Sequence, residues 1–122
     1  MKHFSILLCL MSFVGCKAAD FRSVDAETFA QVIEDTTVVR LDVRTANEYT
    51  QGHIPNALLI DVTQADFMQK AEQLLPKGKT IALYCRSGRR SKKAAMQLAQ
   101  HGYQVVELNT GFNSWKGEVE QK

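Results

Sequence analysis

Cysteine is scarce in this chain of 122 residues, which contains only Cys9, Cys16 and Cys85. The first two lie in or directly after an apolar N-terminal segment, so the remainder of the chain holds the single thiol of Cys85. One thiol cannot build an internal disulfide framework. The three histidines are far apart in the sequence, and no second cysteine accompanies Cys85, so we expect no metal site.

Three further absences narrow the functional class. The net charge is only +2, so bulk charge gives no support for nucleic-acid binding. No G-x-G-x-x-G element occurs, which leaves nucleotide binding without support, and we expect no cofactor. The longest apolar run, FSILLCLMSFV at positions 4–14, falls well short of the about 20 residues that a membrane-spanning helix needs.

The first 16 residues differ in composition from the rest of the chain. Lys2 and His3 precede the apolar run, and Gly15 and Cys16 follow it, an order typical of a secretory signal. The pair Gly15-Cys16 resembles the lipobox of bacterial lipoproteins, where cleavage leaves a lipidated cysteine at the new N-terminus. Phe13 departs from that box, which usually has leucine there. Ordinary secretion and a buried N-terminal element are the alternatives.

We therefore expect residues 1–16 to be a signal with lipidation at Cys16, and residues 17–20 to be a linker. Residues 21–117 would form one domain, and residues 118–122 a C-terminal tail. The protein would be exported, and either periplasmic or lipid-anchored to the cell envelope. Only that lipid would bring it to a membrane.

Strand and helix patterns alternate along the expected domain. Short β-branched or apolar runs predict strands, and apolar residues at a 3.6-residue period behind a capping residue predict helices. The predicted strands are 21–24, 38–43, 57–60, 80–84 and 105–108. Three predicted helices follow the caps Asp25, Thr45 and Thr63. A fourth begins near Arg89, and a short last helix spans 112–116. This alternation predicts an α/β fold, a small, mostly parallel five-stranded sheet with helices on both faces.

The stretch YCRSGRRSKK, residues 84–93, places the thiol of Cys85 at the end of a predicted strand. In parallel α/β sheets the binding crevice lies beyond the carboxyl ends of the strands. A strand, a tight loop and a helix N-terminus bring several backbone N–H groups together there. Such a site lowers a thiol pKa below its usual value of about 8.5. The pattern predicts a catalytic Cys85, and the alternative is a small buried structural cysteine.

The loop after Cys85 is basic and contains several small residues. Its arginines, Arg86, Arg89 and Arg90, would stabilise a thiolate and favour an anionic substrate. Small side chains let a backbone curl around a bound atom. The small residues are Ser87, Gly88 and Ser91. We interpret Lys92 and Lys93 as solvated helix surface, and leave the role of Arg89 open.

Protein phosphatases are the main competing enzyme class. The tyrosine-phosphatase signature has five residues between its cysteine and the arginine that forks onto phosphate. Counted from Cys85, Arg90 comes one place too early, and Ser91 occupies the expected position. Low-molecular-weight phosphatases and arsenate reductases share the longer spacing and are disfavoured with it. A shorter loop forms a narrower cradle, better matched to one sulfur atom than to a phosphoryl group.

Three motifs, in the right order, resemble the rhodanese family. CRSGRR, residues 85–90, is similar to the active-site pattern of thiosulfate sulfurtransferases. LDVRTANEYTQGHIPNA, 41–57, resembles the upstream signature of the family, and GFNSWKG, 111–117, resembles the closing one. Asn56 and Thr110 depart from this pattern, because glycine is usual at both positions, although asparagine tolerates positive φ.

The resemblance implies a persulfide cycle. The Cys85 thiolate would take the outer sulfur of a donor such as thiosulfate, release sulfite, and pass the sulfur to cyanide or to an acceptor thiol. Loop amides from Arg86 to Ser91 would stabilise the anionic sulfur. Arg86 and Arg90 would orient the sulfonate end of thiosulfate. The alternative is a persulfide carrier or protein-interaction module that does not turn over thiosulfate.

Other polar and aromatic residues have simpler interpretations. Asp42 and Arg44 form a supporting pair that positions loops at a strand end. Glu48 serves a helix cap. His53 packs in a turn, since a thiolate that is already formed needs no general base. Trp115 anchors the last helix to the core.

Overall fold

The computed structural model describes residues 20–121 of the chain. The expected signal at 1–16, its Cys16 and the linker up to residue 19 lie outside these residues. The elements are β1 (Arg22–Val24), α2 (Ala26–Val32), β2 (Val39–Asp42), α3 (Ala46–Gln51), β3 (Leu58–Leu59), α4 (Phe67–Leu74), β4 (Thr80–Tyr84), α5 (Arg89–Gln100), β5 (Gln104–Leu108) and the 3₁₀ helix η1 (Phe112–Ser114). In the described part of the chain, no helix has the length and apolar character needed to cross a membrane.

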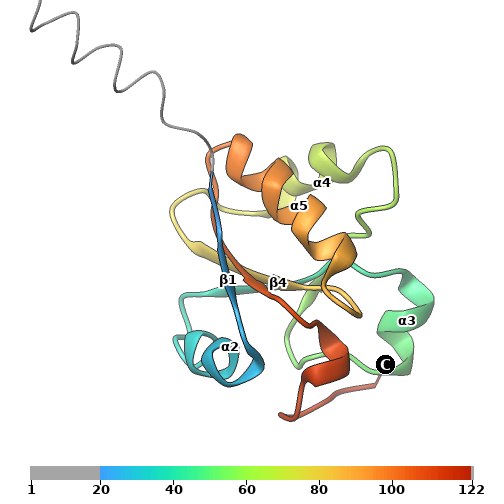
Figure 1. The fold of residues 1–122 in the computed structure, drawn as a ribbon. Coiled ribbons are helices and arrows are strands. Elements are labelled where there is room, and N and C mark those ends of the chain that lie inside the picture. The colour runs from blue at the N-terminus through green and yellow to red at the C-terminus, as the bar shows by residue number, and fades with distance from the viewer. Residues whose placement is uncertain (1–19, 122) are drawn as a thin grey trace, which may run out of the picture.

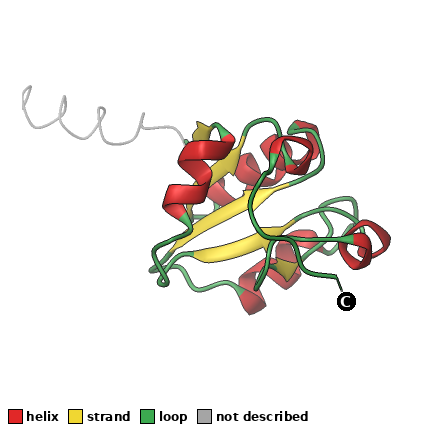
Figure 2. Cartoon of the chain, turned by 90° about the horizontal axis from the view of Figure 1, so that it is seen from below, coloured by secondary structure: helices red, strands yellow, loops and turns green. Residues whose placement is uncertain are grey.

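The five strands form one sheet in the order β1-β5-β4-β2-β3, and every neighbouring pair is parallel. The predicted α/β fold is confirmed, with a sheet that is entirely parallel. Helices α4 and α5 lie on one side of the sheet and α2 lies on the other (Figure 1). Figure 2 shows the strands running between these two helical layers. A parallel sheet needs such cover, because both of its faces are apolar.

Alternation along β4 divides the core into two clusters. Leu83 and Cys85 face the cluster under α4 and α5, whereas Ala82 and Tyr84 face the cluster under α2. All four side chains have no exposed surface. Since β4 lies at the centre of the sheet, the residue that follows it is fixed by packing on both faces.

The start of α4 differs from the prediction. Thr63 does not cap this helix, because its N–H and its hydroxyl both donate to Oδ1 of Asp61, at 2.8 and 2.7 Å. This local turn competes with helix formation, and α4 begins only at Phe67. Leu74, the last residue of this helix, is 54% exposed. The last predicted helix is also shorter, a single 3₁₀ turn.

Parallel topology brings three strand ends to the same edge of the sheet. Asp42 ends β2, Tyr84 ends β4 and Leu108 ends β5. Each strand end is followed by a loop that bears polar side chains or closely packed backbone. This edge carries Cys85 and is the candidate site.

Candidate active site

Cys85 follows β4 directly, and its sulfur lies at the base of the loop that leads into α5. The N–H of Gly88 donates to the sulfur at 3.1 Å. Burial of the thiol by itself raises the pKa of Cys85. The hydroxyl and N–H of Ser91 and the N–H groups of Gly88 and Ser87 lower it by more, so the net effect is a lowered pKa. The loop therefore favours a thiolate.

The cradle depends on the backbone of Gly88. This residue has φ of +99°, and a Cβ built there would overlap the carbonyl oxygen of Asn109. The loop is thus pressed against the segment that follows β5. A hydrogen bond of 2.8 Å from the N–H of Phe112 to the carbonyl oxygen of Cys85 fixes the same contact. Only glycine allows both the conformation and the close approach.

Cys85 itself has no exposed surface in the resting structure. Three residues of the loop around it, Arg86, Ser87 and Arg89, are exposed. A donor therefore reaches the sulfur only after the side chains or backbone of the loop shift. In the resting structure the sulfur is therefore closed off from solvent.

The loop arginines are placed differently from one another. Arg86 and Arg89 are exposed, whereas the guanidinium of Arg90 forks onto Glu48 of α3, with N–O distances of 2.8 and 3.0 Å. The hydrogen bonds from Arg90 lower the pKa of Glu48 from 4.5 to about 2. Arg90 was expected to orient an anionic donor together with Arg86. In the structure its donors are directed at a carboxylate of the protein.

Glu48 has two functions, of which the sequence indicated one. It forms the expected capping box with Thr45 at the start of α3. It also anchors Arg90, which lies 42 residues further along the chain. A long-range ion pair of this kind leaves no periodic signal in the sequence, and so only the cap could be predicted.

Asp42 and Arg44 form a buried ion pair beside the site. The side chains are 0% and 4% exposed, and Nη2 of Arg44 lies 2.7 Å from Oδ2 of Asp42. Arg44 also donates to the carbonyl oxygen of Gly52 at 2.6 Å and lies 4.4 Å above the ring of Phe112. Burial would lower the pKa of this guanidinium, but the Asp42 carboxylate raises it by more. The pair connects β2, α3 and η1 around the active-site loop.

A cavity opens next to the loop. It is lined by Arg44, Glu48, Gln51, Gly52, Arg86, Phe112 and Asn113. The charges of Arg44 and Glu48 are matched by Asp42 and Arg90. Among residues 20–121, Arg86 has no ion-pair partner within 4 Å, so it supplies the unmatched positive charge of the cavity. The cavity thus favours an anion.

Two residues near the loop make contacts that the sequence did not indicate. Lys92 is exposed on α5, as predicted, but its Nζ also contacts the carbonyl oxygens of Gly88 and Asn109 and a carboxylate oxygen of Glu107, at 3.0–3.2 Å. Glu107 is fully buried in β5. The only sequence signal for it was an acidic residue inside the apolar strand QVVEL.

His53 and Trp115 are packed as expected of structural residues. His53 is 1% exposed, stacks on Tyr49, and contacts the carboxylate of Glu120 at 3.2 Å through Nε2. Trp115 packs edge-on against Phe29 with ring centroids 6.1 Å apart. Neither side chain lines the cavity beside the loop.

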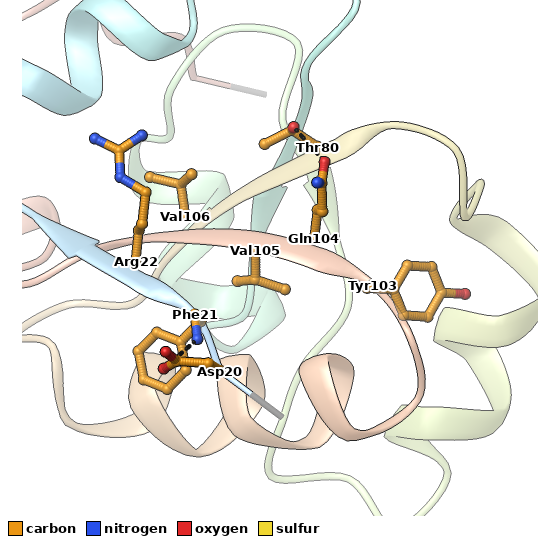
Figure 3. A pocket seen from close by; sticks show the side chains of 8 residues that line it. All are labelled: Asp20, Phe21, Arg22, Thr80, Tyr103, Gln104, Val105 and Val106. Carbon is orange, nitrogen blue, oxygen red and sulfur yellow. Dashed lines mark hydrogen bonds between the residues drawn. The ribbon is translucent and has the colours of Figure 1, made fainter. Parts of the chain in front are cut away.

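A second cavity lies at the opposite end of the sheet (Figure 3). Thr80 and Gln104, which begin β4 and β5, contribute to its lining. Cys85 lies five positions along from Thr80, which corresponds to roughly 16 Å of extended strand. This cavity is therefore remote from the thiol. Within residues 20–121, no group of three potential metal ligands occurs.

The geometry of the thiol loop agrees with the comparison of the sequence with known protein families. The rhodanese-like domain matches residues 25–118. This chain belongs to the rhodanese-like family. The family assignment covers every element from α2 to η1, including all of the residues around Cys85.

Relatives with descriptive names support a role in sulfur transfer. A sulfurtransferase of Allochromatium vinosum is 36% identical over 94 residues, which cover 75% of this chain and 85% of the relative. A putative sulfur carrier protein, YrkF of Bacillus subtilis, is 30% identical over 84% of this chain and 55% of its own length. The crystal structure of a rhodanese-related protein from Thermoplasma volcanium, 28% identical, superposes with a TM-score of 0.73 and covers 84% of this chain and 100% of its own.

Proposed function

We propose that this rhodanese-like protein is a thiosulfate sulfurtransferase with Cys85 as its nucleophile. The Cys85 thiolate attacks the outer sulfur of thiosulfate, a new S–S bond forms, and sulfite leaves with the electron pair of the bond that breaks. Cyanide or an acceptor thiolate then attacks the outer sulfur of the Cys85 persulfide. Thiocyanate or a new persulfide leaves, and the Cys85 thiolate is regenerated.

The observation that carries this proposal is the convergence of N–H groups on the Cys85 sulfur. The Gly88 N–H lies at 3.1 Å, and the N–H groups of Ser87 and Ser91 contribute to the lowered pKa of the thiol. The same donors suit the terminal sulfur of a persulfide, which is also an anion. Arg86 orients the sulfonate oxygens, because it brings unmatched positive charge to the cavity beside the loop.

Turnover with thiosulfate and cyanide tests the proposal directly. Thiocyanate formation should exceed that of a Cys85→Ser control, and intact mass after thiosulfate alone should show one added sulfur atom. An aryl phosphate should not be hydrolysed. Phosphatase activity that is lost in Cys85→Ser would overturn the assignment of a sulfur site.

The second candidate is a persulfide carrier without thiosulfate turnover. Two observations favour it, the name of the Bacillus subtilis relative and the complete burial of Cys85, which would protect a bound sulfur. A carrier would show the added sulfur with a protein or small-molecule persulfide donor, yet no thiocyanate above the Cys85→Ser control. The two measurements together separate an enzyme from a carrier.

The proposal includes export, for which the support is the order of residues 1–16. A lipid on Cys16 would hold the domain at the cell envelope, and ordinary secretion would release it to the periplasm. Mass spectrometry of membrane-extracted protein should find an acylated chain that starts at Cys16. A soluble mature chain cut at another residue would contradict lipidation.

A further inference from the structure

Glu107 is a buried carboxylate for which the proposed cycle has no use. It has no exposed surface, and its neighbours in β5, Val106 and Leu108, are apolar core residues. Its register partner on β4 is Leu83. A charged group in such surroundings is costly unless hydrogen bonds compensate it. The partners of Glu107 therefore indicate why it is tolerated.

Three donors from two elements surround the Glu107 carboxylate. The hydroxyl of Ser23 on β1 donates to Oε1 at 2.6 Å. The hydroxyl of Ser91 on α5 donates to Oε2 at 2.5 Å, and Nζ of Lys92 lies 3.2 Å from the same oxygen. Hydrogen bonds from three donors, one of them a cation, offset the cost of burying this carboxylate.

Ser91 is at the same time part of the loop around the thiol. It lies three positions after Gly88, whose N–H donates to the Cys85 sulfur at 3.1 Å, and neither Ser91 nor Cys85 has exposed surface. The hydroxyl and the N–H of Ser91 are the two largest contributions that lower the pKa of Cys85. A hydroxyl has only one hydrogen to donate. Ser91 can direct that hydrogen to Glu107 or to the Cys85 sulfur, but not to both.

We propose that Glu107 is a positioning residue for Cys85 and acts by competing with its sulfur for the single hydroxyl hydrogen of Ser91. This inference rests on the proposed function only in that the nucleophile is the thiolate. In the resting structure the hydrogen belongs to Glu107, at 2.5 Å. In that arrangement the loop N–H groups stabilise the thiolate, and the Ser91 hydroxyl adds nothing further.

The competition changes in the course of the cycle. When Cys85 carries a persulfide, the negative charge lies on the outer sulfur, and the Ser91 hydrogen can stay on Glu107. When the acceptor removes that sulfur, charge returns to the Cys85 sulfur and the hydroxyl turns towards it. Ser23 and Lys92 continue to satisfy Glu107 meanwhile. Glu107 thus weakens the stabilisation of the free thiolate by the Ser91 hydroxyl and leaves the loop N–H groups in place.

Other charged groups face this pair and would remain in a Glu107 variant. Lys92 of α5 contacts Glu107 itself. The pKa of Arg90 is raised mainly by Glu48 of α3, with smaller contributions from the charges of Cys85 and Asp61. The test therefore has to separate the Ser91 hydrogen from direct charge–charge effects.

The pH dependence of Cys85 alkylation by iodoacetamide provides this test in the full-length protein. A neutral amide is a weaker acceptor than a carboxylate, so Glu107→Gln should release the Ser91 hydrogen to the sulfur. The midpoint of the alkylation profile should fall by about one pH unit. In a Ser91→Ala background the same Glu107→Gln change should leave the midpoint where Ser91→Ala alone puts it.

Each other result counts against the inference. An unchanged or raised midpoint in Glu107→Gln would show that no competition exists. An equal fall with and without Ser91 would show that Glu107 acts only through its charge across space. The unfolding temperature of each variant establishes that the comparison is made on folded protein.

A second measurement needs no change at Glu107. In protein labelled with ¹³C at glutamate carboxyl carbons, the Glu107 resonance should shift as Cys85 ionises, and this shift should be absent in Cys85→Ser. A Glu107 resonance that does not shift when Cys85 ionises would overturn the inference. Both experiments follow ionisation of the sulfur and not sulfur transfer, so a protein without thiosulfate turnover could still pass them.

Discussion

Arg90 and Glu48 are joined by two parallel hydrogen bonds, from Nη1 to Oε1 at 2.8 Å and from Nη2 to Oε2 at 3.0 Å. Arg90 lies in the first turn of α5, and Glu48 caps α3 through Thr45. One carboxylate therefore fixes the starts of two helices, of which α3 lines the cavity beside the thiol. Because the guanidinium is planar, the fork also sets the orientation of Arg90 towards the active-site loop.

Acid should weaken the fold through this pair. The pKa of Glu48 is lowered from 4.5 to about 2, with the hydrogen bonds from Arg90 as the largest cause. A lowered carboxyl pKa gives stability that is complete above pH 4.5 and is lost as the pH falls from 4.5 towards 2. In urea unfolding at pH 7, Glu48→Gln should cost about 1 kcal/mol, since solvent screens a partly exposed pair. This difference from wild type should vanish near pH 2.

Glu72→Gln is the matched control for that experiment. Glu72 pairs with Lys77 at 3.2 Å, but both side chains are well exposed. Its removal should change the free energy of unfolding by less than about 0.5 kcal/mol at every pH. Glutamine preserves the capping box at position 48, so a loss in Glu48→Gln reports the ion pair. Equal, pH-independent effects of the two substitutions would contradict the assigned role of Arg90.

The parts of the fold that could be predicted are those whose signal is local. The strand before Cys85 and the capping box of Glu48 were readable because apolar runs and cap residues lie close together in the sequence. The all-parallel order follows from alternation with helices. The start of α4 was wrong because a turn between Asp61 and Thr63 competed with the cap.

The parts of the site that could not be predicted depend on contacts between distant segments. Glu107 meets Ser23 across 84 residues and Ser91 across 16, so its partners exist only in the folded sheet. Arg90 is of a residue type that often binds anions. Only the fold showed that its guanidinium already donates to a carboxylate of the protein. Asn56, by contrast, stands where the family usually has glycine. Its φ is +67°, and the residue type alone indicated that asparagine tolerates a positive φ at this position.

The buried pair of Asp42 and Arg44 should be far more sensitive than a surface pair. Asp42→Asn leaves the guanidinium of Arg44, only 4% exposed, without its counter-charge, and should cost about 3 to 5 kcal/mol in the free energy of unfolding. Asp66→Asn, which removes the partner of Lys70 at an exposed site, should cost less than about 0.5 kcal/mol. Chemical denaturation of both variants at pH 7 measures this. Similar small losses would show that Arg44 is solvated in solution.

Access to Cys85 should depend on the size of the reagent. The thiol is ionised more readily than a free cysteine but has no exposed surface. The pKa of an ordinary free thiol is about 8.5, and Cys85 in native protein should therefore react with iodoacetamide well below that pH. A bulky maleimide should react slowly with native protein and at its normal relative rate in urea. Equal relative rates in both states would mean that the sulfur is open to solvent.

Gly88→Ala should disable the thiol loop, and Gly102→Ala provides its control. Both glycines have positive φ, +99° and +91°, so alanine costs about 1 to 2 kcal/mol of backbone strain at either position. Only at Gly88 would the new Cβ also overlap the carbonyl oxygen of Asn109, whereas nothing lies within 4 Å of one at Gly102.

Because the Gly88 N–H donates to the Cys85 sulfur, displacing this backbone removes thiolate stabilisation. Alkylation of Cys85 at pH 7 should then slow by about tenfold in Gly88→Ala, the loss of one hydrogen bond to a charged group, and stay unchanged in Gly102→Ala. A Gly88→Ala protein that keeps both the alkylation rate and the free energy of unfolding of Gly102→Ala would show that the loop does not need its left-handed residue to activate the thiol.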